Sequence, residues 1–321
     1  MKKAFLILLS VFFFQSALPL QASIFSSVEM ESTEVQEAQK KKGGFILKRA
    51  LDDIKVDGKE KSLKGKTKIA VPFFRLNFMT DDKYRNAASG NTSKVKSELV
   101  GIETSTMQQV TDEMYADFLE QLRQAGYEVV PADEFKKSEK YEKLDNEYPD
   151  VKRDKVQMVP AGLTFPGKFR DPAPDISEDL GALVMKVDLE IDYLIINANQ
   201  SRFNILKDAA HVEVTQGINA LGIATVYSEG KMTTVTLQQP VTSGRPFGQI
   251  SDDTSTLSKV NDVATFASGW VTQGGLGSKR QTSRSFDVIA DNNQYRLAVG
   301  DVLAQINRRI TALMQELRDK E

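Results

Sequence analysis

Three carboxylates alternate with apolar residues in one stretch of the chain, and their spacing limits the chemistry they can do. Asp188, Glu190 and Asp192 occupy every second position between Met185 and Ile195. A period of two predicts a β-strand with one buried and one solvated face. Alternate residues of a strand lie about 7 Å apart, too far for two carboxylates to share a proton or hold one small cation unaided. We interpret them as a solvated sheet face, with a weak divalent-cation site as the alternative.

Other residue types that support catalysis or cofactor binding are scarce in this chain. It has no cysteine and one histidine, so zinc sites of the Cys/His type are excluded and a Ser-His-Asp triad could use only His211. His211 begins an alternating run, and we interpret it as a residue at a strand end. The glycines from Gly274 to Gly277 lack the strand-before, helix-after context of a phosphate-binding loop. We therefore predict no catalytic residue, cofactor site or metal site.

Four residues are candidates for contact with a partner protein. Trp270, the single tryptophan, lies close to Phe266 in a stretch rich in Ser, Thr and Gly. An amphipathic ring in a loop of this kind can anchor a partner, although packing against its own domain is the alternative. Pro172 and Pro174 lie in an irregular segment suited to wrapping over another surface, where a short polyproline II stretch is expected.

The N-terminus has the three parts of a secretory signal peptide. Lys2 and Lys3 precede an apolar run from Ala4 to Phe14, and small residues follow up to Ala22. This run is short for a membrane span, and its order of charge, apolar core and small residues is typical of a cleaved signal. We expect residues 1–22 to be removed and the protein to act in the periplasm, at the outer-membrane periphery or in the medium.

The composition restricts which partners an exported protein of this kind can have. Without cysteine it has no disulfides and no acceptor for a lipoprotein anchor. Loss of Lys2 and Lys3 changes the formal net charge from −2 to −4, a mildly acidic balance that argues against nucleic-acid binding. We expect envelope proteins as partners, a homo-oligomer as a further option, and at most peripheral contact with a membrane.

The first half of the chain predicts a strand–helix–strand unit. Residues 68–74 (KIAVPFF) form a short apolar run, and Pro72 indicates that the strand lies at a sheet edge or ends there. Apolar residues recur every three or four positions in 103–125, which predicts a helix, and Gly126 ends it. Residues 127–130 then predict a second strand, parallel to the first because a helix connects them.

The second half predicts an antiparallel meander and a closing helix. Alternating runs at 185–196, 212–227 and 232–237 predict three strands, joined in the last case by a turn at Gly230. A long apolar stripe over 291–317, capped by Asp291, predicts a C-terminal helix. We therefore predict an α/β (α+β) fold with a mixed sheet on which this helix packs.

Between these elements the chain predicts less regular structure. Residues 23–66 are polar and rich in charge, and we expect a flexible segment. Residues 67–321 then form one domain with three long insertions: 75–100, 133–180 and 239–290. The first reads as a polar loop, the second as a charged helix or loop followed by irregular chain, and the third as loops with one or two short strands.

The order of these elements resembles the envelope α/β domain at the N-terminus of the Tol-Pal propeller protein. The same domain type is found in the curli-export channel lipoprotein and in activator lipoproteins of penicillin-binding proteins. The matching motifs are Ile69–Phe73 (IAVPF), Leu122–Val130 and Asp192–Ile195 (DYLI). The resemblance covers 68–130, 183–238 and 291–317. It implies an envelope protein, and it brings no catalytic residues with it.

These observations predict a non-enzymatic, exported envelope protein that acts through protein–protein contacts in secretion, outer-membrane or cell-surface assembly. A first alternative is a pore or channel component of the outer membrane that uses the strands at 212–227 and 231–237. A second alternative is a hydrolase of an envelope polymer, whose carboxylate pair would come from distant positions.

Overall fold

The computed structural model describes residues 54–88, 91–167, 171–197, 212–252, 270–272 and 281–320, and all structural statements concern these residues. Several sequence predictions lie outside them: the signal peptide at 1–22, the first thirty or so residues of the 23–66 segment, His211, Phe266 and the glycines at 274–277.

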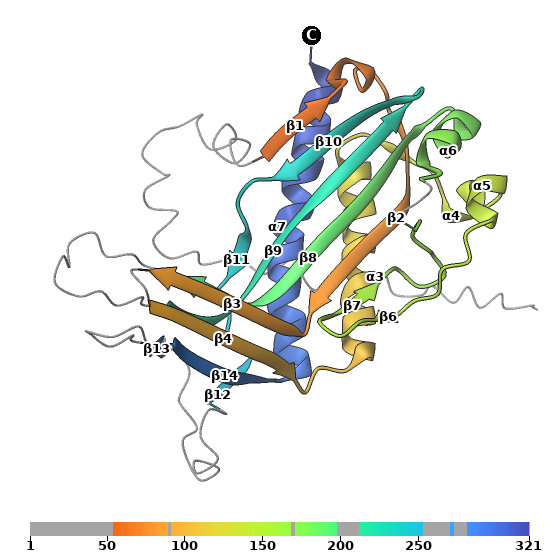
Figure 1. Ribbon diagram of the computed structural model, residues 1–321. Helices are drawn as coiled ribbons and strands as arrows, with labels where there is room; N and C mark the ends of the chain where they lie inside the picture. The colour runs from red at the N-terminus through yellow and green to blue at the C-terminus, as the bar shows by residue number, and fades with distance from the viewer. Residues whose placement is uncertain are drawn as a thin grey trace, which may run out of the picture.

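The larger of two sheets, sheet A, contains the predicted meander. Its strands run in the order β1-β10-β9-β8-β2-β7-β6 (Figure 1). They span Ile54–Gly58 (β1), Lys231–Leu237 (β10), Val212–Ser228 (β9), Leu183–Asn197 (β8), Lys68–Met79 (β2), Lys155–Met158 (β7) and Asp150–Val151 (β6). β2 is parallel to β8 and to the short β5 (Glu128–Val129), whereas β8, β9 and β10 are antiparallel. The predicted mixed sheet is confirmed.

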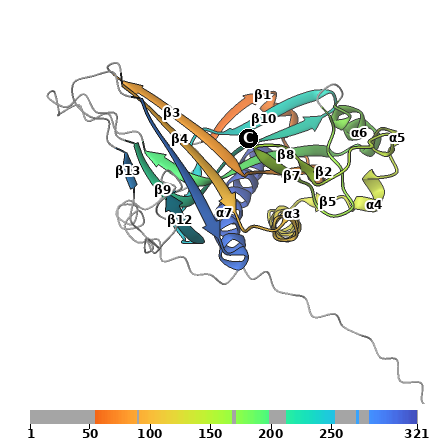
Figure 2. The same cartoon turned by 60° about the horizontal axis from the view of Figure 1, so that its bottom comes forward.

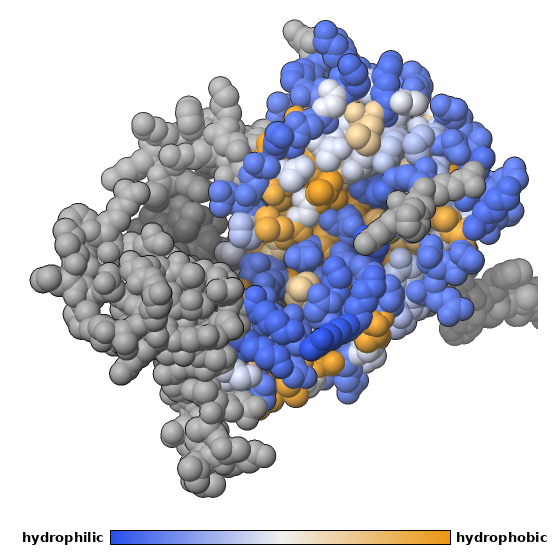
Figure 3. All heavy atoms as spheres, viewed as in Figure 1, coloured by the Kyte–Doolittle hydropathy of each residue, from blue (hydrophilic) through white to orange (hydrophobic). Residues whose placement is uncertain are grey.

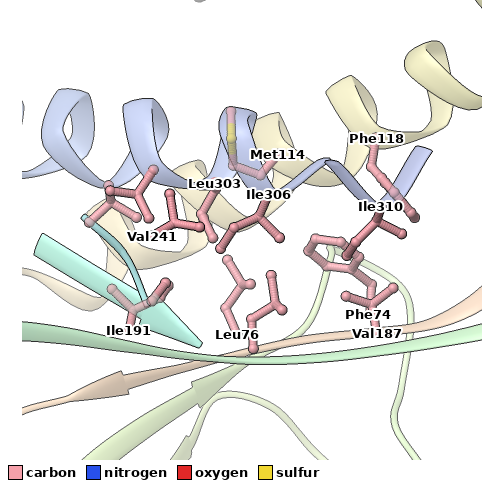
Figure 4. Packing of buried hydrophobic residues seen from close by; sticks show 14 of the residues in the cluster. Phe74, Leu76, Met114, Phe118, Val187, Ile191, Val241, Leu303, Ile306 and Ile310 are labelled. Atoms are coloured by element: carbon pink, nitrogen blue, oxygen red, sulfur yellow. The ribbon is translucent and has the colours of Figure 1, made fainter. Parts of the chain in front are cut away.

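Two long helices cover one face of sheet A, which we call the inner face. α3 (Thr104–Gln124) and α7 (Asn292–Asp319) lie together in one layer beneath the strands (Figure 2). The Asp291 carboxylate caps α7 by accepting a hydrogen bond from the Gln294 amide at 2.9 Å. Side chains such as Phe118 and Ile310 from the helices pack against Phe74 and Val187 from the strands (Figure 4). The predicted closing helix therefore packs on the sheet.

Pro72 lies inside sheet A, so the prediction of an edge strand is wrong. The pairing of β2 with β8 shifts between Ala70 and Phe73, which is the mark of a β-bulge. Ile69 and Val71 before the bulge, and Phe74 after it, belong to the inner core, so the alternation changes phase at the proline. On its other flank β2 pairs with β5 only up to Ile69 and with β7 only from Leu76. The proline thus sits where its missing N–H leaves no gap in a ladder.

Residues 75–100 form strands rather than the predicted polar loop. β2 continues to Met79, and β3 (Asp81–Ala88) pairs with β4 (Asn91–Val100). β4 is also parallel to β14 (Gln281–Ala290), and β12 (Gly248–Asp252) completes a second sheet, sheet B. The apolar alternation that predicts strands is weak in this segment, and β4 is paired both with its neighbour β3 and with the distant β14.

The predicted insertion at 133–180 is largely folded. α4 (Ala132–Phe135), α5 (Glu139–Glu142), β6, β7 and α6 (Ala173–Leu180) together form what we call the lobe, residues 131–167 and 171–182. Its side chains build a second apolar cluster on the other face of sheet A, the outer face, around Phe73, Tyr141 and Phe165. Pro174 lies in the first turn of α6, which suits proline, so a polyproline II stretch is the wrong prediction.

Two other segments also contain more regular structure than predicted. In the described part of the 23–66 segment, β1 pairs with β10, and a 3₁₀ turn, η1 (Glu60–Ser62), is followed by the fully buried Leu63. In 239–290, β11 (Val241–Ser243) and β13 (Trp270–Thr272) pair with β9, in addition to β12 and β14. Both segments add strands to sheets whose partners are far away in the sequence.

Candidate interaction surfaces

The outer face of sheet A divides into a covered and an uncovered half. The lobe covers the face over β2 and the start of β8, where Phe73 is fully buried between Tyr141 and Phe165. Over the C-terminal part of β9 and over β10 and β1, the described chain leaves the face open, whereas β3 and β4 pass in front of the start of β9 (Figure 1). The covered half is therefore part of the core, and the uncovered half is a candidate contact surface.

A polar network forms the boundary between the two halves. Arg75 donates to both oxygens of Asp188, at 3.0 Å from its Nε and 2.5 Å from its Nη2, and lies 4.1 Å from the centre of the Phe165 ring. Asn77 Nδ2 donates to the same carboxylate at 2.7 Å. Burial by itself would lower the pKa of Arg75, but Asp188 outweighs this and the pKa is raised. Asp188 is thus a structural acceptor that holds the edge of the lobe.

A second set of polar contacts ties the lobe to β8 and β9. Lys186 pairs with Asp171, and the Tyr227 hydroxyl donates to the same carboxylate at 2.8 Å. Burial, with Asp171 adding to it, raises the pKa of Tyr227, so this hydroxyl keeps its proton. These contacts position Asp171 just before α6, and they neutralise Lys186 on the charged side of β8.

The three alternating carboxylates do not form one site. Asp188 accepts hydrogen bonds from Arg75, and Glu190 is exposed at the open face. One oxygen of Asp192 accepts hydrogen bonds from the Tyr193 and Leu194 amides at 2.7 and 3.2 Å, where β8 bulges. Burial, with the nearby Asp82 adding to it, raises the pKa of Asp192 to about 6. Among the described residues no group of three or more potential ligands could hold a metal ion.

The uncovered half presents an aliphatic patch, which we define as Leu221 and Ile223 on β9. Their exposed fractions are 39% and 44%. Cross-strand neighbours on the same face are polar: Glu190 opposite Leu221, and Asp188 and Thr236 opposite Ile223. Figure 3 shows this side of the molecule, with hydrophobic residues set among hydrophilic ones. An apolar pair framed by polar residues on a rigid sheet is suited to contact with another protein.

The close approach of β9 to β8 makes this region of the sheet rigid. A Cβ atom on Gly222, between the two patch residues, would lie 2.5 Å from the Asp188 carbonyl oxygen and 2.9 Å from Leu189 Cα. Only glycine therefore fits at this position. Leu221 and Ile223 project from a backbone that is fixed on both sides.

Three of the four predicted contact residues lie in the described chain, and the structure does not bring these three together; Phe266 lies outside the described residues. Trp270 begins β13, opposite Val214 of β9, so it lies in a strand rather than in a loop. Pro172 is buried at the start of α6, and Pro174 is half-buried. A partner contact at Trp270, Phe266, Pro172 or Pro174 stays a prediction.

Sequence reasoning missed the aliphatic patch, although a signal was present. The run 212–227 places Ile218, Ala220, Ala224 and Val226 on the buried face, which the structure confirms. Leu221 and Ile223 fall on the opposite face of this run, where polar residues are expected. Two aliphatic residues on the solvated side of an alternating strand were the available signal.

Two depressions of about 340 Å³ each lie in the described surface, and neither presents two carboxylates that are both free of an ion pair. One lies on the lobe beside Tyr141 and Glu142, and the other lies beside Lys66, Glu178 and Glu229. Lys66 forms an ion pair with Glu229, which lowers the pKa of that carboxyl. Hydrolysis by two carboxylates requires both to be available to the substrate, so Glu229 is poorly placed for it.

Comparisons with known proteins do not assign this chain to a family. No protein-family model matches it, and no curated protein matches its sequence. None of the described helices combines the length and apolarity needed to cross a membrane. The fold class, an α/β protein with a mixed sheet, is therefore the level at which the chain can be placed.

Proposed function

We propose that this protein is an exported, non-enzymatic envelope protein that acts through protein–protein contacts in secretion, outer-membrane or cell-surface assembly. The observation that carries the proposal is the aliphatic patch on the uncovered half of sheet A. The signal-peptide pattern and the resemblance to the envelope α/β domain group support the compartment. The proposed location is the periplasm or the outer-membrane periphery.

The architecture favours contact at this face over contact elsewhere on sheet A. The inner face is filled by α3 and α7, and the lobe fills the outer face over β2. The exposed large apolar side chains of the described sheet A are Leu221 and Ile223 on β9, Met232 on β10, and Val151 on the two-residue edge strand β6. A flat, preorganised face loses little conformational entropy when a partner binds.

The residues around the patch define the chemistry of the partner. Leu221 and Ile223 require aliphatic or aromatic side chains opposite them. Glu190 is exposed beside Leu221, and the described chain places no ion pair on it. A protein surface with an apolar centre and one cation at its rim would match both features.

Site-specific photocrosslinking in the producing cell tests the proposal. A photoreactive residue at position 223 should give a discrete crosslink to another envelope protein, and the double variant Leu221→Glu/Ile223→Glu should abolish co-purification of that protein. Both positions are exposed, but Glu190 and Asp188 lie opposite the new carboxylates, so circular dichroism of the double variant establishes that it is folded.

Val100 and Ile289 provide a matched control on sheet B. They are cross-strand neighbours with exposed fractions of 39% and 51%. A photoreactive residue at position 289 should give no such crosslink, and Val100→Glu/Ile289→Glu should leave co-purification unchanged. Equal crosslinking at 223 and 289, or an absence of crosslinks at 223, would contradict the proposal, as would recovery of the protein from the cytoplasm.

A further inference from the structure

We infer that the turn between β1 and β2 is a docking point for the phosphate groups of an anionic lipid surface. The turn carries Lys59, Lys61 and Lys64, which we call the cationic cap. Residues 55–68 contain six lysines and two acidic residues, a net charge of +4 in a chain whose net charge is −2. This inference does not depend on the aliphatic patch.

The cap is held in place by the fold. Leu63, in its centre, is fully buried in the main core. The Lys59 amide donates to the Met232 carbonyl oxygen at 3.0 Å, and the Gly65 amide donates to the Arg318 carbonyl oxygen at 3.0 Å. Ser228 Oγ also donates to the Ser62 carbonyl oxygen at 3.0 Å. The three lysines therefore lie on an ordered turn at one end of the molecule, beside the C-terminal end of α7 (Figure 1).

Three carboxylates near the cap are already neutralised by other cations, whereas Glu178, beside Lys66, has no ion pair within the described chain. Glu60 pairs with Lys320 at 3.1 Å, Glu229 with Lys66, and Asp319 with Arg318 at 2.7 Å. No ion pair within the described chain involves the three lysines of the cap, and all three are exposed. The cap thus has three positive charges whose counter-ions must come from solution or from a partner.

Two features favour a lipid surface over an acidic protein. Lysine is depleted in protein–protein interfaces, whereas clustered lysines attract anionic headgroups. Met232, whose backbone binds Lys59, is 50% exposed. An apolar side chain beside lysines can enter the boundary between headgroups and acyl chains. This combination predicts peripheral attachment with the turn facing the membrane.

Sedimentation of the full chain with lipid vesicles tests the inference. Vesicles of phosphatidylglycerol and phosphatidylcholine should bind the protein, pure phosphatidylcholine vesicles should not, and binding should weaken as salt is raised. Each lysine near an anionic surface strengthens binding about five-fold, so Lys59→Ser/Lys61→Ser/Lys64→Ser should bind about a hundred-fold more weakly. Circular dichroism establishes that the variant is folded.

A matched control removes three positive charges elsewhere. Lys96, Lys137 and Arg153 are exposed, and the described chain places no ion pair on them. Their replacement by serine should change vesicle binding less than about three-fold, because they lie outside the cap. If both triple variants lose binding equally, or if the cap variant binds normally, the inference is overturned.

Soluble polyphosphate distinguishes lipid headgroups from free phosphate as the source of the phosphate groups that bind the cap. Met232→Ser should weaken vesicle binding but leave the binding of inorganic polyphosphate unchanged, since only a membrane offers an apolar layer. Binding of polyphosphate without binding of vesicles would overturn the assignment to lipid. The variant Leu221→Glu/Ile223→Glu should still bind vesicles, so failure of the proposed function can be told apart from failure of this inference.

Discussion

The two halves of the outer face of sheet A differ in what their side chains contact. On the covered half, Phe73 packs against Tyr141 and Phe165, and Arg75 binds Asp188 beneath the edge of the lobe. On the uncovered half, Ile223 stands among polar neighbours, 44% exposed. The outer face of the same strands is thus part of the core where the lobe covers it. Where the lobe does not reach, that face is a candidate contact surface.

The largest expected effect comes from an aromatic residue of the covered half. Phe73→Ala removes a fully buried ring and should lower the free energy of unfolding by about 3 to 5 kcal/mol. Ile223→Ala, on the uncovered half, should lower it by less than about 0.5 kcal/mol. Urea denaturation of both variants measures the contrast. Similar losses at the two positions would show that the halves are not energetically distinct.

A pH-dependent effect is expected further along β8, where the outer face approaches sheet B. Burial and Asp82 raise the pKa of Asp192 from its ordinary value of 3.8 to about 6. Between these values the folded protein retains a proton that the unfolded chain has released, so stability falls as the pH rises through this window. At pH 7, Asp192→Asn should therefore be more stable than the parent by up to about 3 kcal/mol.

Thermal denaturation between pH 4 and 8 measures this effect. The asparagine side-chain oxygen can still accept the hydrogen bonds from Tyr193 and Leu194, so the bulge should persist. Glu190→Gln, one step earlier on the same side of β8, is the control and should change the pH profile only slightly, because Glu190 is exposed and adds least to the raised pKa of Asp192. If the stability difference between Asp192→Asn and the parent does not grow between pH 4 and 6, an elevated pKa at Asp192 is ruled out.

A smaller effect is expected from the ion pair at the boundary. Asp188→Ala leaves the partly buried Arg75 without its acceptor and should cost about 1 to 2 kcal/mol of stability. Asp57→Ala removes an ion pair with Lys55 that is more than half exposed and should cost less than about 0.5 kcal/mol. Chemical denaturation of the two variants measures the loss of stability in each. Equal losses would show that the ion pair of Arg75 is as solvent-screened as that of Lys55.

Strong periodic patterns in the sequence predicted the main elements well. The stripe over 103–125 became α3, the stripe over 291–317 became α7, and the alternating runs became β8, β9 and β10. The predictions failed where pairing is distant or polar. β4 pairs with the distant β14 as well as with its neighbour β3, and the bulge at Pro72 allows a proline inside sheet A. Neither feature leaves a local pattern in the sequence.

The candidate surfaces were less accessible to sequence reasoning than the fold. Leu221 and Ile223 were visible as aliphatic residues on a solvated face, but the sequence does not show that the lobe stops short of them. The lysines at 59, 61 and 64 were visible as a run of charge, which commonly indicates a solvated segment. That Leu63 anchors them on an ordered turn is visible only in the folded chain.

The sequence by itself determined the helices, the meander and the absence of cysteine, because hydrophobic periodicity and composition are local properties. Tertiary structure alone decided which half of the outer face is covered and which carboxylates have partners. Asp188, Glu190 and Asp192 have the same spacing and chemistry, yet one binds Arg75, one is exposed and one caps a bulge with a raised pKa. Burial and charge at each position depend on residues that are distant in the chain, and only folding brings them together.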